Sequence, residues 1–574
     1  MILQALVSYY ELMAQKGEIS KPGWGPGKIS YALEIDGEGA PIALYPLKVA
    51  ADDKGKKMRP REMVLPAAVK RTVGISSNFL WDNAMYLLAL DSKGNPERAL
   101  LCFEDAKALH LSLLAGVEDP FAQAICKFFQ SWRPAAAAEP PVIADNLEAL
   151  LAGENLVFMF DGAFPAENAA LARAWQKHYD SDGTGPRMRC LVTGENAIPE
   201  TTHPSVKNVQ GAQSSGAALV SFNAPAFCSY NREQNLNAPM GKYASFAYTT
   251  ALNHLLSDRQ HRTLIGDSTV VYWAEDGMPQ SQDAFGFFLG ITDDTVKDRD
   301  LKAIMDKLAE GAAVDWEGLP LKPENRFFVL GLAPNAARIS VRFFLQDTFG
   351  NFAKHLQAHY QRLEIIKPSF DTVSQLPLWQ LLRETVNLNS RDKAPSPQMA
   401  GDTLRAILTG GRYPTTLYQG VQLRIRADRE INRGRAAIIK AYLTRNTDRE
   451  ICKEVLTVEL NEETRYQPYV LGRLFSLLEN IQETATPGLN ATIKDKYLSS
   501  ACATPAVVFP TLLKLAEKHM RKLDDKMRIY FSKQLLALTA CLDETYPSHH
   551  TLPDQGVFQL GYYHQTQKRY EKKA

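Results

Sequence analysis

Apolar residues recur with a helical period at the start of the chain and then alternate with polar ones. In residues 2–14 they fall three or four positions apart, so that one face of a helix is apolar. The glycine-rich run 23–27 interrupts this pattern. Residues 29–35 and 41–45 then alternate around a short turn, as the two strands of a hairpin do. The beginning of the chain is therefore predicted to mix helix and sheet.

The same patterns divide the rest of the chain into a part with strands and a part without them. Apolar or alternating runs predict further strands at 156–160, 189–193, 218–222, 269–273, 327–332 and 338–344. Beyond Met399 helical spacing dominates, at 404–408, 435–443, 471–478, 507–515 and 533–542. The predicted fold class is α+β: a mixed N-terminal region with β-sheet and helices, followed by an all-α C-terminal helical bundle.

Two stretches without periodicity predict the boundaries between segments. The alanine- and proline-rich residues 135–141 and the charged, proline-rich residues 390–398 indicate surface connections. A length of 574 residues favours roughly three to four domains. We therefore expect an N-terminal α/β region with a basic loop at 1–134, a mixed α/β region with a polar loop at 142–389, a basic helical segment at 399–457 and a C-terminal helical bundle at 458–574.

Composition narrows the class of protein. Lys and Arg number 65 against 64 Asp and Glu, so contact with a polyanion must depend on local basic surfaces. The seven cysteines are scattered without a CxxC pair, which indicates reduced thiols rather than a disulfide framework or a zinc site. No apolar stretch is long enough for a membrane span, and the start lacks the features of a signal peptide. The expected location is the cytoplasm.

The first group of candidate binding residues lies before and within residues 74–83. Seven lysines and arginines between positions 54 and 71 form a basic cluster that runs into Asn78 and Asn83. Basic side chains suit phosphate contact, and amides suit contact with base edges. The alternative is a solvated loop beside a buried network of Asn side chains. The neighbouring aromatic residues fit a core better than a stacking platform: Phe79, Trp81 and Tyr86.

A second candidate is the polar segment 205–216, which is rich in glycine and amides and is expected as a loop ahead of the strand 218–222. Lys207 suits a phosphate, while Gln210 and Gln213 suit base edges or the nucleic-acid backbone. The alternative is an ordinary flexible loop, since polar loops are common.

The densest basic stretch is 424–445, where seven Lys and Arg residues are opposed by two acidic ones, Asp428 and Glu430. Arginine dominates there, which favours bidentate contact with phosphates or carboxylates. Arg429 and Arg433 lie four apart and are expected on one face of a helix. The alternative is a solvated helix, which more often carries alternating signs of charge. We therefore expect contact with a nucleic acid or a partner protein.

The sequence contains no recognisable catalytic constellation. Phosphate-binding-loop, nucleophile-elbow and zinc-helix motifs are absent. His549 and His550 are adjacent, so they point apart in regular structure, and no third ligand is near. Asp267, Glu275 and Asp276 suit a two-metal nuclease site, but a core strand is expected between them. We expect no catalytic residue, no metal and no cofactor.

Several motifs, taken together, resemble one protein family across essentially the whole chain. They are found at 1–6, 74–83, 218–227, 237–239, 246–253, 266–275, 330–342, 409–414 and 555–564. In this combination they are similar to the large subunit of the type I-C CRISPR surveillance complex, Cascade. The C-terminal segment additionally resembles the small subunit of that system, which arises by internal initiation. No Met lies between Met399 and Met520, so such initiation here requires a non-AUG codon.

The resemblance implies a noncatalytic subunit of an RNA-guided complex, placed near the 5′ end of the guide RNA. Such a subunit recognises the protospacer-adjacent motif (PAM) on duplex DNA, promotes unwinding and R-loop formation, and offers a docking surface to the helicase-nuclease. The implied partners are the guide RNA, double-stranded target DNA, the displaced single strand, the backbone, 5′-handle-binding and small subunits, and the helicase-nuclease. No membrane is involved.

With this resemblance the polar and basic side chains become candidate DNA contacts, and the polar loop is expected to face DNA. Those expected at the duplex or the PAM are Lys70, Arg71, Asn78, Asn83, Lys207, Gln210, Gln213 and Asn223. Those expected at the backbone of a displaced or guide-paired strand are Arg424, Arg426, Arg433 and Arg435. Two alternatives stay open: a metal-dependent nuclease with a site assembled from distant acidic residues, and a purely architectural subunit.

Overall fold

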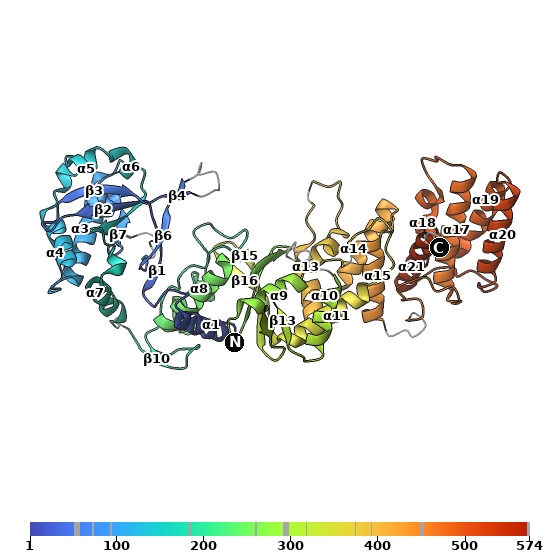
Figure 1. Ribbon diagram of the computed structural model, residues 1–574, viewed down its shortest axis with the longest axis horizontal. Coiled ribbons are helices and arrows are strands. Elements are labelled where there is room, and N and C mark those ends of the chain that lie inside the picture. Colours follow the sequence, from blue (N-terminus) through green and yellow to red (C-terminus); the bar gives the residue numbers. More distant parts are fainter. Residues whose placement is uncertain are drawn as a thin grey trace. The chain divides into compact units, whose positions relative to one another are not determined.

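The structure is a computed structural model, and Figure 1 labels its helices and strands. It divides into two compact units. Unit 1 consists of Met1–Val206 and Ala218–His254, and unit 2 of Lys207–Ala217 and Leu255–Ala574. The chain therefore enters unit 2, returns to unit 1 and leaves it again. The residues that the structure describes are 1–50, 58–69, 71, 74–91, 94–181, 185–258, 261–290, 298–316, 318–373, 375–391, 393–447 and 453–570.

A four-stranded sheet forms the centre of unit 1, in the order β3-β2-β8-β7. Its strands are β2 (Tyr31–Ile35), β3 (Pro41–Pro46), β7 (Trp81–Asn83) and β8 (Asn155–Met159). The pairing of β2 with β3 confirms the predicted hairpin. β8 pairs in parallel with β2 and antiparallel with β7. The expected boundary at 135–141 thus falls inside one unit, because a strand that follows it is hydrogen-bonded between strands that precede it.

Helices cover this sheet around an aromatic core that includes the fully buried Phe103, Phe128 and Phe158. The helices of unit 1 are α1 (Ile2–Lys16), α2 (Ala84–Leu88), α3 (Pro96–Leu113), α4 (Pro120–Ser131), α5 (Pro141–Ala144), α6 (Leu147–Leu151) and α7 (Ala169–Asp180), with most of α8 (Lys242–Ser257). Short 3-10 turns occupy Pro134–Ala136, Pro165–Glu167, Pro225–Phe227 and Gln234–Asn237. The predicted first helix is confirmed as α1, whose Tyr10 ring contacts Phe246 of α8 edge to face.

Two-stranded ribbons complete the described part of unit 1. They are β1 (Trp24–Ile29) with β6 (Arg61–Pro66), β4 (Val49–Ala50) with β5 (Met58–Arg59), and β9 (Met188–Arg189) with β10 (Asn196–Ala197). The strand predicted at 218–222 is wrong, and of 189–193 only the first residue lies in a strand. Hydrophobic alternation does not show whether a neighbouring strand is available for pairing. At 217–218 the chain is passing from unit 2 back into unit 1.

Unit 2 begins with an antiparallel sheet in the order β11-β12-β15-β16. Its strands are β11 (Arg262–Ile265), β12 (Ser268–Ala274), β15 (Arg326–Asn335) and β16 (Arg338–Thr348), and a small pair is formed by β13 (Val314–Trp316) and β14 (Leu319–Leu321). Every residue of β12 is buried, as its continuous apolar run predicts. Val270, Tyr272 and Phe327 belong to a core that continues into the helices.

The remainder of unit 2 is helical, and the predicted α+β class is confirmed. The helices are α9 (Pro279–Phe288), α10 (Asp298–Ala309), α11 (Phe349–Leu363), α12 (Leu378–Arg383), α13 (Pro397–Leu408), α14 (Thr415–Asp428), α15 (Arg433–Asn446), α17 (Gln467–Ala485), α18 (Ile493–Ala503), α19 (Pro505–Met520), α20 (Asp525–Thr539) and α21 (Leu552–Lys568). One hydrophobic core runs from the sheet through α13–α15 to the C-terminal helices, so the expected segments 399–457 and 458–574 share it. Among the described residues, no helix is both long and apolar enough to cross a membrane.

Two glycines allow α17 and α21 to pack backbone against backbone. A Cβ atom on Gly472 would lie 1.9 Å from the Phe558 carbonyl oxygen, and one on Gly561 would lie 2.1 Å from the Tyr469 carbonyl oxygen. No side chain fits at either position without moving a helix. The C-terminal helices are therefore held together by a contact that depends on the absence of a methyl group.

We expect Gly472→Ala to lower the free energy of unfolding by about 3 kcal/mol or more, because the new methyl meets a backbone atom that cannot rotate away. The matched control is Gly401→Ala within α13, where a Cβ atom meets nothing within 4 Å. That change should leave stability equal or raised by up to about 1 kcal/mol. Urea-induced unfolding of the two variants measures the difference. Equal stabilities would contradict the close crossing.

Candidate nucleic-acid interface

The segment 74–83 is organised around a buried carboxylate. The side chain of Asp82, 1 % exposed, forms an ion pair with the guanidinium of Arg71 and accepts the backbone N–H groups of Asn78 and Asn83, both at 2.9 Å. The Arg71 guanidinium also lies 3.9 Å from the centroid of the Tyr86 ring. Burial raises the pKa of Asp82, while Arg71 and the two N–H groups act in the opposite direction. Arg71 thus neutralises an internal charge.

The two asparagines of this segment also serve the fold. Asn78 is buried, and its Oδ1 accepts the N–H of Val69 at 2.9 Å. Asn83 caps α2, because its Oδ1 accepts the N–H of Met85 at 3.1 Å. Lys70 lies outside the described residues. These placements favour the buried Asn network that the sequence left open, and the core role expected of Phe79, Trp81 and Tyr86 is confirmed by their burial.

His110 of α3 supports the same segment through a hydrogen bond, and sequence reasoning missed this residue. Leu80 has a left-handed backbone with a φ of 70°, and its N–H donates to Nε2 of His110 at 2.8 Å. Nδ1 of His110 lies 2.7 Å from the Ala106 carbonyl oxygen, so this nitrogen carries the proton and the ring is neutral. Burial lowers the pKa of His110 to about 4. The available signal was a single histidine among the leucines of residues 109–114.

Most of the polar loop 205–216 lies in unit 2, which includes Lys207–Ala217, and its backbone is anchored to the sheet. The N–H of Gln210 donates to Oγ1 of Thr269 in β12 at 2.9 Å. Arg262 of β11 donates to the Asn208 carbonyl oxygen at 3.1 Å. The loop makes two tight turns, closed by the N–H groups of residues 212 and 216. Its conformation is therefore defined, which argues against an ordinary flexible loop.

This anchoring leaves the side chains of the polar loop outside. Lys207, Gln210 and Gln213 are exposed, whereas Val209 and Ala217 are buried beneath them. Ammonium and amide groups on a fixed backbone suit phosphate and base edges respectively. Asn223 is exposed as well, but it belongs to unit 1, so the structure does not place it with the loop.

The arginines of 424–445 are largely used inside unit 2. Arg435 is buried and paired with Glu384 at 3.3 Å and Asp428 at 2.5 Å. Arg424 forms a second ion pair with Asp428, and the two arginines outweigh the effect of burial, so that the pKa of Asp428 is lowered. Arg433 is paired with Asp371 at 2.9 Å. The acidic partners Glu384 and Asp371 come from more than forty positions upstream, which local charge counting does not reveal.

Two further details of this stretch differ from expectation. Arg429 and Arg433 do not share a helix, because α14 ends at Asp428, Arg429 adopts a left-handed conformation and α15 begins at Arg433. Arg426 is exposed and donates to the amide oxygen of Gln555 at 2.9 Å.

The sequence did carry a signal that residues 433–446 are buried. The helix α15 has apolar residues on all sides, which is typical of an internal helix rather than of a solvated one.

A different basic surface, which sequence reasoning missed, is exposed on the C-terminal helices. Between positions 514 and 533 the sequence has seven Lys and Arg residues against three acidic ones. We call it the α19–α20 surface and define it by its exposed cations Lys514, Lys518, Arg521, Lys522, Lys526 and Lys533. Tyr530 and Ile529 of α20 are also exposed there. The lysines on α19 lie four positions apart in the sequence, which was the available signal. The arginine stretch 424–445 has fewer acidic neighbours, so sequence reasoning favoured it instead.

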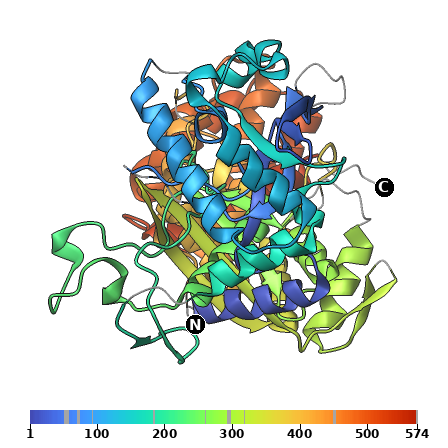
Figure 2. The ribbon, with the colours of Figure 1, turned by 90° about the vertical axis from the view of Figure 1, so that its left-hand side faces the viewer.

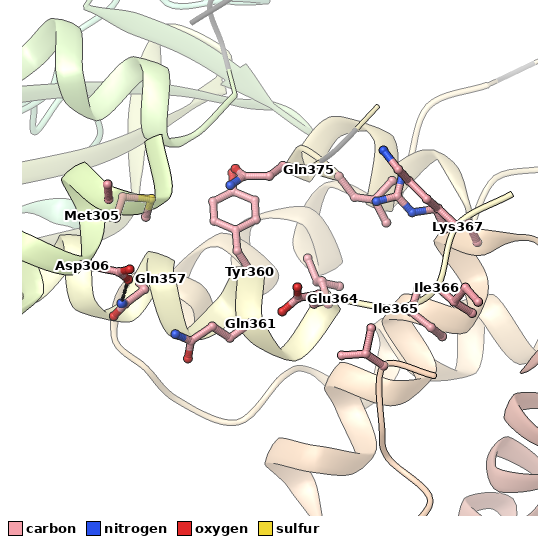
Figure 3. Close-up of a pocket in the computed structure, with 15 residues that line it drawn as sticks. Met305, Asp306, Gln357, Tyr360, Gln361, Glu364, Ile365, Ile366, Lys367 and Gln375 are labelled. Atoms are coloured by element: carbon pink, nitrogen blue, oxygen red, sulfur yellow. Dashed lines mark hydrogen bonds between the residues drawn. The ribbon is translucent and has the colours of Figure 1, made fainter. Parts of the chain in front are cut away.

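Unit 2 also contains a cavity of about 580 Å³ between α10, α11 and residues 364–376. Figure 3 shows Gln357, Tyr360 and Gln361 lining it from α11, with Asp306 of α10 accepting a hydrogen bond from Gln357. The lining is mainly apolar and carries the carboxylate groups of two acidic residues. Two basic side chains, Lys367 and Arg433, balance these carboxylates, and Arg433 is the one predicted DNA contact in the lining.

The acidic residues considered for a nuclease are separated. Asp267 and Glu275 flank the extended strand β12, so they lie on the order of 25 Å apart, and each is paired with an arginine of the sheet. Two catalytic metals need ligands around centres about 4 Å apart. His550 is buried against the Cys502 carbonyl oxygen, while His549 is exposed. Among the described residues, no group of three or more metal-ligating side chains converges.

Comparison with known proteins gives one family. The model of a family described as CRISPR-associated protein (Cas_Csd1) matches residues 6–570, which is nearly the whole chain. No curated protein matches the sequence.

We expect Arg71→Ala to lower the free energy of unfolding by about 3–5 kcal/mol, because the buried Asp82 carboxylate loses its partner. The loss should be larger at pH 8 than at pH 5, since an unpaired buried carboxylate has a raised pKa and must give up its proton as the pH rises. Urea-induced unfolding at both pH values measures it. Arg173→Ala, at an exposed arginine of α7, is the control and should change stability little. An unchanged stability of Arg71→Ala would return Arg71 to the candidate DNA contacts.

The neutral His110 predicts a loss of stability in acid. The folded-state pKa of about 4 lies below the unfolded value of about 6.5, so the unfolded chain binds more protons in between. Stability should therefore fall as the pH drops below 6.5, and this contribution should reach about 3 kcal/mol near pH 4. His110→Gln keeps an acceptor for Leu80 without a titrating group. Its unfolding free energy should depend less on pH than that of the wild type, and an identical dependence would contradict the assignment.

Proposed function

This chain belongs to the Cas_Csd1 family of CRISPR-associated proteins, and we propose that it is the noncatalytic large subunit of a type I-C Cascade. In this role it recognises the PAM on duplex DNA, promotes unwinding and R-loop formation, and helps to recruit the helicase-nuclease. Guide pairing reads the target sequence, while the protein reads the short motif and the backbone. The proposed partners are the guide RNA, the target DNA and the other subunits.

The observation that carries the proposal is the polar loop. Its backbone is fixed to β12 and β11 by Thr269 and Arg262, while Lys207, Gln210 and Gln213 project outward. A glutamine amide both donates and accepts, so it can match the edge of an adenine in the major groove. Because the loop is ordered before DNA arrives, little of the binding free energy is spent on ordering it.

A second contribution to the proposal comes from the α19–α20 surface. Single strands are bound by cations that follow the phosphates, together with aromatic rings on which bases stack. On this surface the cations include Lys518, Lys522 and Lys526, and the aromatic ring is the exposed one of Tyr530. We therefore assign contact with the displaced strand to this surface, in place of Arg424, Arg433 and Arg435, whose guanidinium groups are paired with carboxylates.

The two rival functions have less support. A nuclease centred on Asp267 and Glu275 would need to join residues at opposite ends of β12. A purely architectural subunit has no use for amides fixed outward on the polar loop, and it predicts DNA binding that does not depend on this chain. Incubation of the purified chain with DNA and Mg²⁺ or Mn²⁺ tests the first, since cleavage would overturn the noncatalytic role.

The PAM role is tested with the reconstituted guide-RNA complex and duplex targets that carry randomised flanking bases. Gln210→Ala or Gln213→Ala should weaken binding to the preferred flank about 5- to 150-fold and flatten the preference, as the loss of a base-edge contact does. Lys207→Ala should weaken all flanks alike, because a phosphate contact carries no sequence information. Gln419→Ala, at an exposed glutamine of α14, is the control. Flank preference that is absent, or unchanged in all loop variants, would contradict the assignment.

The α19–α20 surface is tested by the salt dependence of R-loop binding. Changing Lys514, Lys518 and Lys522 to Gln should reduce the slope of log affinity against log salt by about 2, since each lost single-strand phosphate contact contributes about 0.7. The control variant changes three exposed lysines elsewhere, Lys177, Lys307 and Lys354, to Gln. An equal effect of the two triple variants would show a general charge effect and would remove the surface from the proposal.

A further inference from the structure

The segment that leads into α8 in unit 1 contains a sharply bent loop at residues 224–238. Figure 2 shows this blue-green to green part of the chain as an irregular loop that extends to one side of α1. At its tip, Tyr230 and Asn231 have left-handed backbones with φ values of 52° and 55°. The N–H of Arg232 donates to the Ser229 carbonyl oxygen at 3.0 Å and closes the turn. Two successive positive φ angles and this hydrogen bond define a type I′ turn.

A single side chain holds this turn in place. Asn237 accepts the backbone N–H of Ser229 at 2.9 Å through Oδ1. Its Nδ2 donates to the carbonyl oxygens of Arg232 at 2.7 Å and Gln234 at 2.9 Å. One amide thus ties both ends of the turn and the residue beyond it. The shape of the exposed tip, residues 229–234, is therefore defined by hydrogen bonds within the loop.

The conformation is unfavourable for the residue that occupies it. A type I′ turn favours Gly or Asn at its central positions, and an aromatic residue with a positive φ is a true outlier. The Tyr230 side chain is 93 % exposed, so its ring contributes almost nothing to the fold by burial. Backbone strain of this kind persists where the surrounding structure enforces it, and it concentrates at functional sites. The turn therefore presents an aromatic ring to solvent at a cost in stability.

We propose that Tyr230 is a stacking platform for an unpaired nucleobase where the target duplex opens. This inference rests on the proposed role in R-loop formation. Every base has an aromatic face, and stacking on a tyrosine tolerates any sequence. The neighbours Asn231, Arg232 and Gln234 are exposed and polar, and they can donate to base edges or phosphate.

The character of the tip favours a base over an apolar protein surface. A protein hot spot is ringed by groups that exclude water, whereas Tyr230 has exposed polar neighbours on both sides. Arg232 and Glu233 carry opposite charges, so the tip has no net charge and should gain little from phosphate neutralisation. Loss of the ring should then lower affinity without changing the salt dependence, in contrast to the α19–α20 surface.

The experiment uses the full chain in the reconstituted guide-RNA complex. Target duplexes each carry one 5-iodouracil, a base that crosslinks on irradiation to an aromatic side chain stacked on it, at successive positions of the flank and the first target bases. The crosslinked peptide is identified by mass spectrometry. Affinity is measured in parallel for Tyr230→Ala and Tyr230→Phe, and for Phe370→Ala as a control at an exposed aromatic residue of unit 2. Each is also tested on a duplex held closed by an interstrand crosslink.

We expect crosslinks to Tyr230 from one or two adjacent positions. Tyr230→Ala should bind the duplex that can open about 5- to 150-fold more weakly, the range for one stacked base. Tyr230→Phe should bind within about twofold of the wild type, because the ring is kept. On the closed duplex, Tyr230→Ala and the wild type should bind alike, and the salt slope should not change. Asn237→Ala keeps the ring but releases the turn, so it should weaken binding to the duplex that can open.

Other results would overturn the inference and keep it separate from the proposed function. Equal binding of Tyr230→Ala and the wild type, with flank preference intact, would remove the stacking role alone. Loss of the mutated subunit from the complex, seen by native mass spectrometry without a crosslink to Tyr230, would show that the turn docks a protein instead. A crosslink to Tyr230 in a wild-type complex that shows no flank preference would keep the stacking role and contradict PAM recognition.

Discussion

A charged side chain that leaves water must be paired, and this requirement decides which basic residues of the chain are available to a ligand. Asp82 is almost wholly buried and takes Arg71 as its partner. Arg435 is buried and takes Glu384 and Asp428. Leaving any of these charges alone would cost several kcal/mol, more than a surface contact with phosphate returns. Four of the arginines that looked suited to nucleic acid are therefore paired with carboxylates of the protein itself: Arg71, Arg424, Arg433 and Arg435.

The same requirement decides which polar and basic side chains stay available for the proposed contact with DNA. The cations of the α19–α20 surface stay in water on the outside of two helices, where a polyanion can displace counterions from them. The polar loop needs no charge to hold it, because Thr269 and Arg262 bind its backbone and leave the side chains outward. Interior ion pairs thus support the scaffold, and exposed lysines and amides face the solvent. Arg435 suits its buried position because the fork of its guanidinium group can meet two carboxylates at once.

The sequence predicted the parts of this molecule that depend on local pattern. The hairpin β2–β3, the buried run β12 and the C-terminal helices follow from hydrophobic period alone. The pairing of β8 with β2 could not be predicted from the sequence, because the two strands are more than a hundred residues apart and neither has a local pattern that identifies its partner. The partners of Arg433 and Arg435 were hidden for the same reason, since Asp371 and Glu384 are distant in sequence. The exposed polar loop was predicted as a loop, but its anchoring to Thr269 required the sheet.

Two loops of the chain are ordered in different ways before any partner arrives. The polar loop takes its anchors from a neighbouring sheet, so its conformation depends on the stability of unit 2. The turn at Tyr230 takes its anchor from Asn237 of the same loop, so its conformation does not depend on a neighbouring sheet. Ordering a loop at the moment of binding subtracts from affinity, and here that cost has been met during folding. The backbone strain at Tyr230 is part of that cost, and it fits the proposed use of the ring in the position where the turn holds it.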